Sequence, residues 1–177
     1  IFAWAVLVVI VAILLSLFHG ATPALRKFGL GFLVSTAWNP VTEDFGALVS
    51  IYGTLVTSAI AILIGVPVSF GIALFITELC PVFLKRPIGI AIELLAAIPS
   101  IIYGMWGLFV FAPLFGDYIQ PWVSRNLGSL PLVGPLLSGP PMGIGILTAG
   151  IVLAIMVIPF MSAVIRDMFE VVPPVLR

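Results

Sequence analysis

The sequence predicts an all-α protein that crosses a membrane several times as a bundle of helices. Two observations lead to this prediction. Apolar residues make up 62% of the chain and charged residues only 8%, a composition typical of polytopic membrane proteins. Apolar stretches of roughly 20 residues, long enough to cross a hydrocarbon core, recur along the chain without the period-two alternation of a membrane β-strand.

Four such stretches predict four membrane-spanning helices. An even number of crossings brings both chain ends to one side of the membrane. Four basic residues on that side, against three in much longer loops on the other, weakly favour it as cytoplasmic. The predicted spans are about 1–18, 48–76, 88–115 and 143–165, the outer loops are 19–47 and 116–142, and the inner segments are 77–87 and 166–177.

Charge and motifs argue against several other classes of protein. Seven acidic residues balance seven basic ones, so no charge excess suggests nucleic acid as a partner. The single cysteine, Cys80, forms no intrachain disulfide, and the sequence has no run of metal-ligand residues. It also lacks a Walker A loop and a Gly-x-Ser-x-Gly nucleophile elbow. We therefore expect no cofactor, and any nucleotide hydrolysis must occur in a partner.

Three prolines interrupt three of the predicted spans at a similar depth. Pro67, Pro99 and Pro159 lie about 7 to 11 residues from the inner side if each span is one helix. Prolines are generally better tolerated in membrane helices than in soluble ones, which offers a simpler explanation. A shared depth instead predicts a bundle that bends around one level, as transporter bundles do.

Small residues at four-residue spacing predict where helices approach closely. Gly65, Ser69 and Ala73 form one stripe, and Ala96, Ser100 and Gly104 form another. Such stripes let two backbones pack tightly in a membrane.

Few polar side chains lie inside the predicted spans, and each has two interpretations. Glu93 either pairs with Arg86 or Lys85, about two turns earlier, or serves as an ion or proton relay on a translocation path. Ser69, Ser100 and Tyr103 either line that path or donate to the backbone carbonyl one turn earlier, or to a carbonyl that a proline has freed.

Several strings of the sequence resemble the PstC family of permease subunits, which belong to bacterial phosphate-specific ABC importers. The resemblance covers about Phe28 to the end of the chain, and its most specific string is Glu93 to Gly107. The other strings are Tyr52 to Ser58, Gly65 to Glu78, Leu84 to Pro87, and Pro159 with Arg166 to Glu170.

The resemblance implies a type I ABC importer permease fold of about six helices, of which this chain carries the first four. It implies a bacterial inner membrane location, with the outer loops in the periplasm. It also implies three partners: a PstA-like permease subunit, a dimer of PstB-like ATPases and a periplasmic phosphate-binding protein. The family's ATPase-docking loop and its later Arg- and Glu-bearing helix match no position here.

On this basis we expect the chain to form part of the translocation path of an ATP-driven phosphate importer. Arg166, Asp167 and Glu170 are the candidates for packing near the ATPase, with an ordinary membrane-edge charge cluster as the alternative. Other interpretations are a membrane subunit that assembles but transports nothing, a permease for another oxyanion, and an intramembrane enzyme. The enzyme needs a catalytic base that the sequence does not offer.

Overall fold

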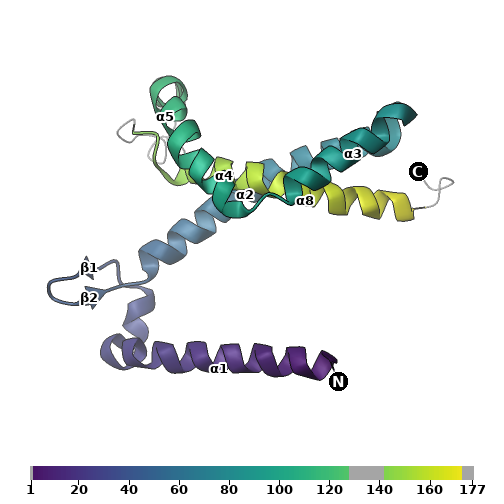
Figure 1. The fold of residues 1–177 in the computed structure, drawn as a ribbon. Helices are drawn as coiled ribbons and strands as arrows, with labels where there is room; N and C mark the ends of the chain where they lie inside the picture. The colour runs from purple at the N-terminus through teal and green to yellow at the C-terminus, as the bar shows by residue number, and fades with distance from the viewer. Residues whose placement is uncertain (1, 128–141, 173–177) are drawn as a thin grey trace. The chain divides into compact units, whose positions relative to one another are not determined.

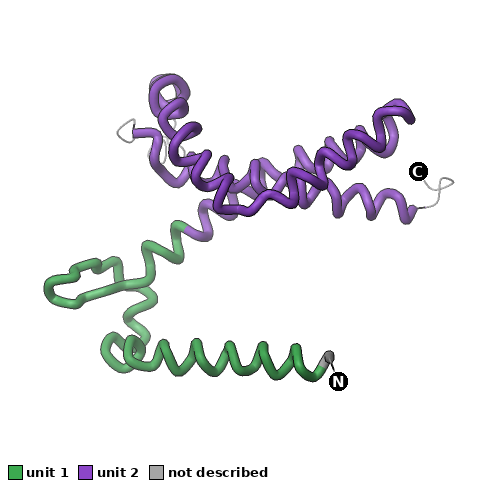
Figure 2. The backbone as a smooth tube through the Cα atoms, viewed as in Figure 1, with its two compact units in different colours: residues 1–53 green, residues 54–177 purple. Residues whose placement is uncertain are grey.

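The computed structural model describes residues 2–127 and 142–172, and most of them lie in helices (Figure 1). The described part contains four helices or helix runs that are long and apolar enough to cross a membrane: Trp4–Leu33, Leu48–Leu79, Ser100–Asn126 and Ile146–Val171. The all-α, multi-pass prediction is therefore confirmed. The chain divides into two compact units, residues 1–53 and 54–177 (Figure 2), which we describe separately.

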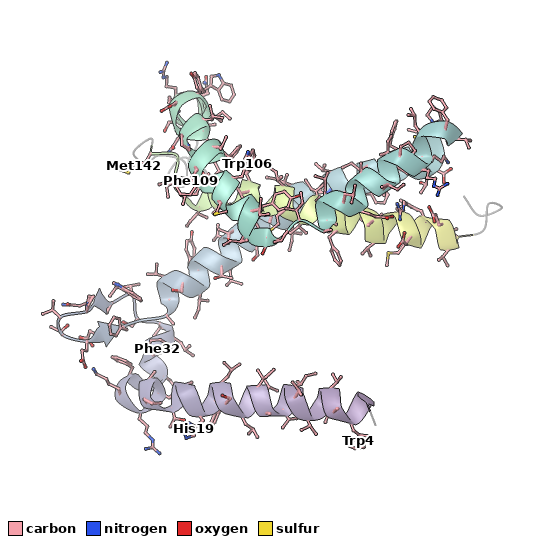
Figure 3. All side chains as sticks on the ribbon, in the orientation of Figure 1. Trp4, His19, Phe32, Trp106, Phe109 and Met142 are labelled. Atoms are coloured by element: carbon pink, nitrogen blue, oxygen red, sulfur yellow. The ribbon has the colours of Figure 1, made fainter. Side chains whose placement is uncertain are left out.

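The first unit begins with the long helix α1 (Phe2–Phe28), which the 3₁₀ turn η1 (Gly29–Leu33) extends. Gly29 has a φ of +61°, a conformation in which glycine commonly terminates helices. The helix therefore continues beyond the predicted first span, 1–18, as far as Gly29. Apolar side chains of α1 are exposed, and Figure 3 shows Trp4 and His19 standing away from its axis.

A short hairpin follows within the predicted outer loop 19–47. It pairs β1 (Trp38–Asn39) with β2 (Asp44–Phe45) in antiparallel register. The rings of Trp38 and Phe45 meet edge to face with centroids 5.2 Å apart. Lys27, near the end of α1, donates to Glu43 at 2.8 Å, so the loop is tied to the helix that precedes it.

The second unit contains most of α2 (Leu48–Leu74), which begins in the first unit and continues into the π-helical turn η2 (Phe75–Leu79). The helix α3 (Val82–Ala96) comes next. A longer helical run then passes through α4 (Ser100–Trp106), η3 (Gly107–Phe111), α5 (Ala112–Leu114), η4 (Phe115–Ile119) and α6 (Gln120–Leu127). The last helix is α8 (Ile146–Val171).

Residues 97–99 separate α3 from α4, so the predicted span 88–115 is not one continuous helix. Pro99 has no N–H for a helical hydrogen bond, and it disfavours the helical conformation of the residue before it. The helix stops at Ala96 and restarts at Ser100. The apolar run long enough to span is consequently Ser100–Asn126.

Other predicted bounds shift by smaller amounts. The span 48–76 agrees closely with Leu48–Leu79, whereas the span 143–165 becomes Ile146–Val171 and takes in part of the predicted inner tail. Residues 82–87 of the inner link begin α3. In the predicted outer loop 116–142, residues 116–127 are helical. Residues 128–141 and 173–177 lie outside the described residues.

The segment leading into α8 packs backbone against backbone. Gly143 has a φ of +70°, and a Cβ there would overlap the carbonyl of Ala112, so only glycine fits. Its N–H donates to the side-chain oxygen of Gln120 at 3.0 Å, and its carbonyl accepts from the Thr148 hydroxyl at 2.6 Å. These contacts fix the start of α8 against the preceding helical run.

Candidate functional site

The helices α2 and α8 meet along two stripes of small residues. The buried residues of α2 recur every four positions, so they lie on one face of the helix. They are Ala61, Gly65, Ser69 and Ala73. The buried residues of α8 are Thr148, Gly150, Ala154, Pro159 and Ser162. The predicted Gly65–Ser69–Ala73 stripe is thus a buried face, and its partner helix is α8.

The contacts show that α2 and α8 run parallel. A Cβ at Gly150 would lie 2.7 Å from Cγ2 of Ile60. Nine residues further along α2, the Ser69 hydroxyl donates to the carbonyl of Ile158 at 3.2 Å. The two helices therefore run in the same direction from their N-terminal to their C-terminal ends. This is the relation expected of the second and fourth crossings of one chain.

Ser69 serves this helix contact rather than an open path in the described structure. Its side chain is fully buried, at 0% exposure, and its hydroxyl bonds across to α8. Regular helical pairing also assigns the Ile158 carbonyl to the backbone N–H of Ser162, four residues later. The Ser162 hydroxyl, 1% exposed, has no hydrogen-bond partner. A carbonyl oxygen accepts two hydrogen bonds. The Ile158 carbonyl accepts these two from the Ser69 hydroxyl and the backbone N–H of Ser162, so it has no place left for the Ser162 hydroxyl.

The three interrupting prolines lie near one level of the second unit. Pro67 precedes and Pro159 follows the Ser69–Ile158 contact by a turn or less. Pro99 falls between two contacts to α8, one from Glu93 and one from Gly107. Only Pro159 is buried, while Pro67 and Pro99 are exposed in this chain. The helices α2 and α8 continue through their prolines, so of these three prolines only Pro99 lies at a helix break.

Tyr103 bridges the break at Pro99. Its hydroxyl donates to the carbonyl of Leu95 at 3.0 Å. Leu95 lies four residues before Pro99, so a helical N–H at position 99 would have bonded this carbonyl. The carbonyl accepts from the N–H of Ile98 at 3.2 Å, and the tyrosine adds a second donor in place of the N–H that the proline lacks.

A polar pocket of about 380 Å³ gathers the charged residues of α3 and α8. The sequence suggested Lys85 or Arg86 as the partner of Glu93, but the structure shows a different one. Oε1 of Glu93 lies 2.9 Å from Nη2 of Arg166. Lys85 instead donates to the backbone carbonyl of Thr77. Pairing across 73 residues could not be found from sequence spacing, although both charges lie in apolar segments and each needed a partner.

Arg166 binds three carboxylates at once. Besides Glu93, it contacts Asp167 Oδ1 at 3.1 Å and Glu170 Oε1 at 3.9 Å. The arginine side chain is only 17% exposed, whereas the three acidic side chains are more than half exposed. Arg166, Asp167 and Glu170, predicted to lie near an ATPase, therefore join the path candidate Glu93 in one cluster.

Ser100 lies elsewhere, in an apolar groove of about 330 Å³ between α4, η3 and α8. Gly104 and Gly107 line the same groove, opposite Thr148 and Val152. The predicted stripe Ala96–Ser100–Gly104 is not one buried face, because the break at 97–99 divides it and all three residues are exposed. The four predicted path candidates thus occupy four different environments.

The described residues hold no group of three or more histidine, cysteine, aspartate or glutamate side chains arranged for a metal ion. The charged cluster is a mixed one, in which a cation faces carboxylates. Such an arrangement connects helices electrostatically rather than holding a divalent ion.

The chain is homologous over nearly its whole length to proteins named "Phosphate transport system permease protein PstC". The protein of Haemophilus influenzae is 57% identical over 176 residues, covering 99% of this chain and 56% of that protein. One from Xylella fastidiosa is 58% identical over 172 residues, covering 97% of the chain and 53% of that protein. A "probable" one from Methanocaldococcus jannaschii is 34% identical over 179 residues.

The chain spans about half the length of the curated relatives that it matches. No family model matches it, and no solved structure matches it. The relatives are named as permease proteins rather than as enzymes, which agrees with the absence of a catalytic motif in the sequence.

Proposed function

We propose that this chain, a homologue of the PstC permease proteins, forms part of the transmembrane path of an ATP-driven phosphate importer. The observation that carries the proposal is identity of 57–58% to such proteins over at least 97% of the chain. Four apolar helices in the described residues supply the membrane-spanning part that a permease needs. The fold we propose is the type I ABC importer permease fold.

The partners belong to the same proposal. A PstA-like permease subunit would complete the path, a dimer of PstB-like ATPases would bind on the inner side, and a periplasmic phosphate-binding protein would deliver the anion. Nucleotide hydrolysis lies outside this chain, whose sequence has no Walker A loop. The proposed location is the bacterial inner membrane, with residues 77–87 and the end of α8 on the cytoplasmic side.

The helix architecture supports a bundle that rocks. Two parallel helices slide most easily where they meet through small side chains, since no large group must leave a socket. The stripe from Ala61 to Ala73 provides such a contact. The break at 97–99 provides a second adjustable point, because the helix is interrupted there and the side chain of Tyr103 bridges the break. Alternating access needs movements of this kind.

The test is phosphate uptake by cells that lack their own phosphate importer and express the full-length protein with its partners. Uptake of labelled phosphate that requires ATP and the binding protein supports the proposal. Competition by unlabelled phosphate but not by sulfate distinguishes a phosphate permease from one for another oxyanion. Assembly of the complex without uptake of any oxyanion would instead support the non-transporting subunit.

Single substitutions then separate path residues from packing residues. Glu93→Gln, Ser100→Ala and Tyr103→Phe each remove one polar function from a different environment. Ser100 lines an open groove, whereas the hydroxyl of Tyr103 is bonded to a backbone carbonyl. Unchanged uptake in all three variants would confine these residues to packing and would remove them from the proposed path.

A further inference from the structure

The charged cluster around Arg166 connects two helices, α3 and α8, whose backbones lie close together. Among the described residues of α3, Gly89 is buried, and Ile88 and Ile92 are half-buried. The ion pair with α8, Glu93 to Arg166 at 2.9 Å, lies one turn after Gly89. This pair therefore adds a polar contact where the two backbones approach each other.

Gly89 makes the contact possible. A Cβ at this position would lie 2.8 Å from Nη1 of Arg166. The guanidinium therefore passes over the bare backbone of α3 on its way to Glu93. A larger residue would push the tip of the arginine away, since that tip is the flexible end of a long side chain.

Each member of the pair has other partners when the pair separates. Arg166 already contacts Asp167 and Glu170 of its own helix, so release from Glu93 does not leave it unpaired. Glu93 has a side chain that is 56% exposed, and Lys85 and Arg86 line the same pocket. A partly exposed pair with such alternatives separates at little cost.

The far end of α3 is joined to α4 by a short non-helical link and by the hydrogen bond from Tyr103 to the carbonyl of Leu95. Residues 97–99 leave the helical path before α4 starts at Ser100. Helix ends joined by a few non-helical residues commonly act as hinges. Such a hinge would let α3 swing about its Leu95 end while Gly107 of η3 stays packed beside Val152 of α8.

We propose that Glu93 and Arg166 form a releasable latch, which holds α3 against α8 in the conformation described here and opens during each transport cycle. On opening, Arg166 keeps its contacts with Asp167 and Glu170 and Glu93 turns to the basic residues of α3. This inference rests on the proposed function, because it assigns the latch to a transport cycle. It makes Gly89, Glu93 and Arg166 positioning residues.

The direct test measures the distance between α3 and α8 in the complete complex. Spin labels replace Leu94 and Met168, two exposed residues beside the latch, each 66% exposed, in a Cys80→Ala background. We expect the distance to lengthen by roughly 5 Å, about one helical turn, when the ATPases are trapped with nucleotide and vanadate. An unchanged distance across nucleotide states would overturn the proposal.

Removal of single charges tests the pair itself. Glu93→Gln and Arg166→Gln, made singly, should each lengthen the resting distance and reduce phosphate uptake at least ~10-fold, while Arg166→Lys, which keeps a positive charge beside Glu93, Asp167 and Glu170, should keep both within ~3-fold of wild type. Gly89→Val should lengthen the resting distance with every charge retained. Arg125→Gln, which removes a positive charge from an exposed position of α6, is the matched control and should change neither measurement.

The two proposals fail separately in this design. If the complex takes up another oxyanion or none, the phosphate proposal is wrong, but the label distance still reports whether the latch opens with nucleotide. If phosphate is taken up and neither Glu93→Gln nor Arg166→Gln changes the resting distance, the latch is wrong and the phosphate proposal stands.

Discussion

The contact between Gly150 and Ile60 gives the sharpest test of the parallel packing of α2 and α8. A Cβ at Gly150 would lie 2.7 Å from Cγ2 and 2.8 Å from Cβ of Ile60. The Cβ of Ile60 is fixed to its own helix backbone, so it cannot turn aside as a flexible side-chain tip can. The substitution Gly150→Ala must therefore push the two helices apart.

The magnitude follows from two opposing effects. Alanine is favoured over glycine inside a helix by about 1 kcal/mol, whereas overpacking a close contact costs about 1–3 kcal/mol. We expect Gly150→Ala to lower the free energy of unfolding by roughly 0–2 kcal/mol. Gly71 lies in α2 with nothing within 4 Å of its would-be Cβ. Gly71→Ala should therefore raise stability by up to about 1 kcal/mol.

The assay is unfolding of the full-length protein in mixed micelles of increasing dodecyl sulfate content, followed by circular dichroism. The difference between the two glycine variants cancels helix propensity and leaves about 1–3 kcal/mol for the close contact. Ile60→Ala, which removes the nearer of the two crowded atoms, should recover part of this loss. Ile60→Val should recover none, because valine keeps both atoms. If Gly150→Ala is as stable as Gly71→Ala, the helices do not meet as described.

Three further predictions concern single hydrogen bonds. Ser69→Ala removes the bond to Ile158 and should lower the free energy of unfolding by about 0.6 kcal/mol, at most about 1.7, in the same assay. Ser162→Ala, by contrast, removes a buried hydroxyl without a partner and should leave stability unchanged or raise it. Tyr103→Phe leaves the Leu95 carbonyl without its side-chain donor. Amide hydrogen exchange at residues 97–103 should therefore become faster than in wild type. Unchanged exchange would contradict the bridging role of Tyr103. The hydrogen bond and charge of Lys27 hold the pKa of Glu43 below its ordinary value of 4.5; this stabilising contribution is present above that value and is lost as the pH falls through the folded pKa. Lys27→Gln should bring the Glu43 titration, followed by NMR, back toward the ordinary value, and an unmoved titration would exclude the pairing.

The architecture of the single helices could largely be predicted from the sequence. Hydrophobicity and length determine which stretches cross a membrane, and these properties belong to each stretch alone. The predicted range 48–76 lies within the helical run Leu48–Leu79 for this reason. The four-residue spacing of Gly65, Ser69 and Ala73 also identified a packing face, because helical periodicity is local. The break at Pro99 was visible as a proline, although its effect on the span bounds was not.

Only the tertiary structure decided which groups meet. The partner of Glu93 is an arginine 73 residues away, and no spacing rule reaches that far. Ser69 was predicted either to line a path or to bond to a carbonyl one turn earlier or freed by a proline. It bonds instead to the Ile158 carbonyl, which depends on how α2 lies beside α8. The sequence by itself determined the helices and their small-residue faces, since these follow from local chemistry. The fold decided the pairing of charges and hydroxyls, since each pair depends on the positions of two helices at once.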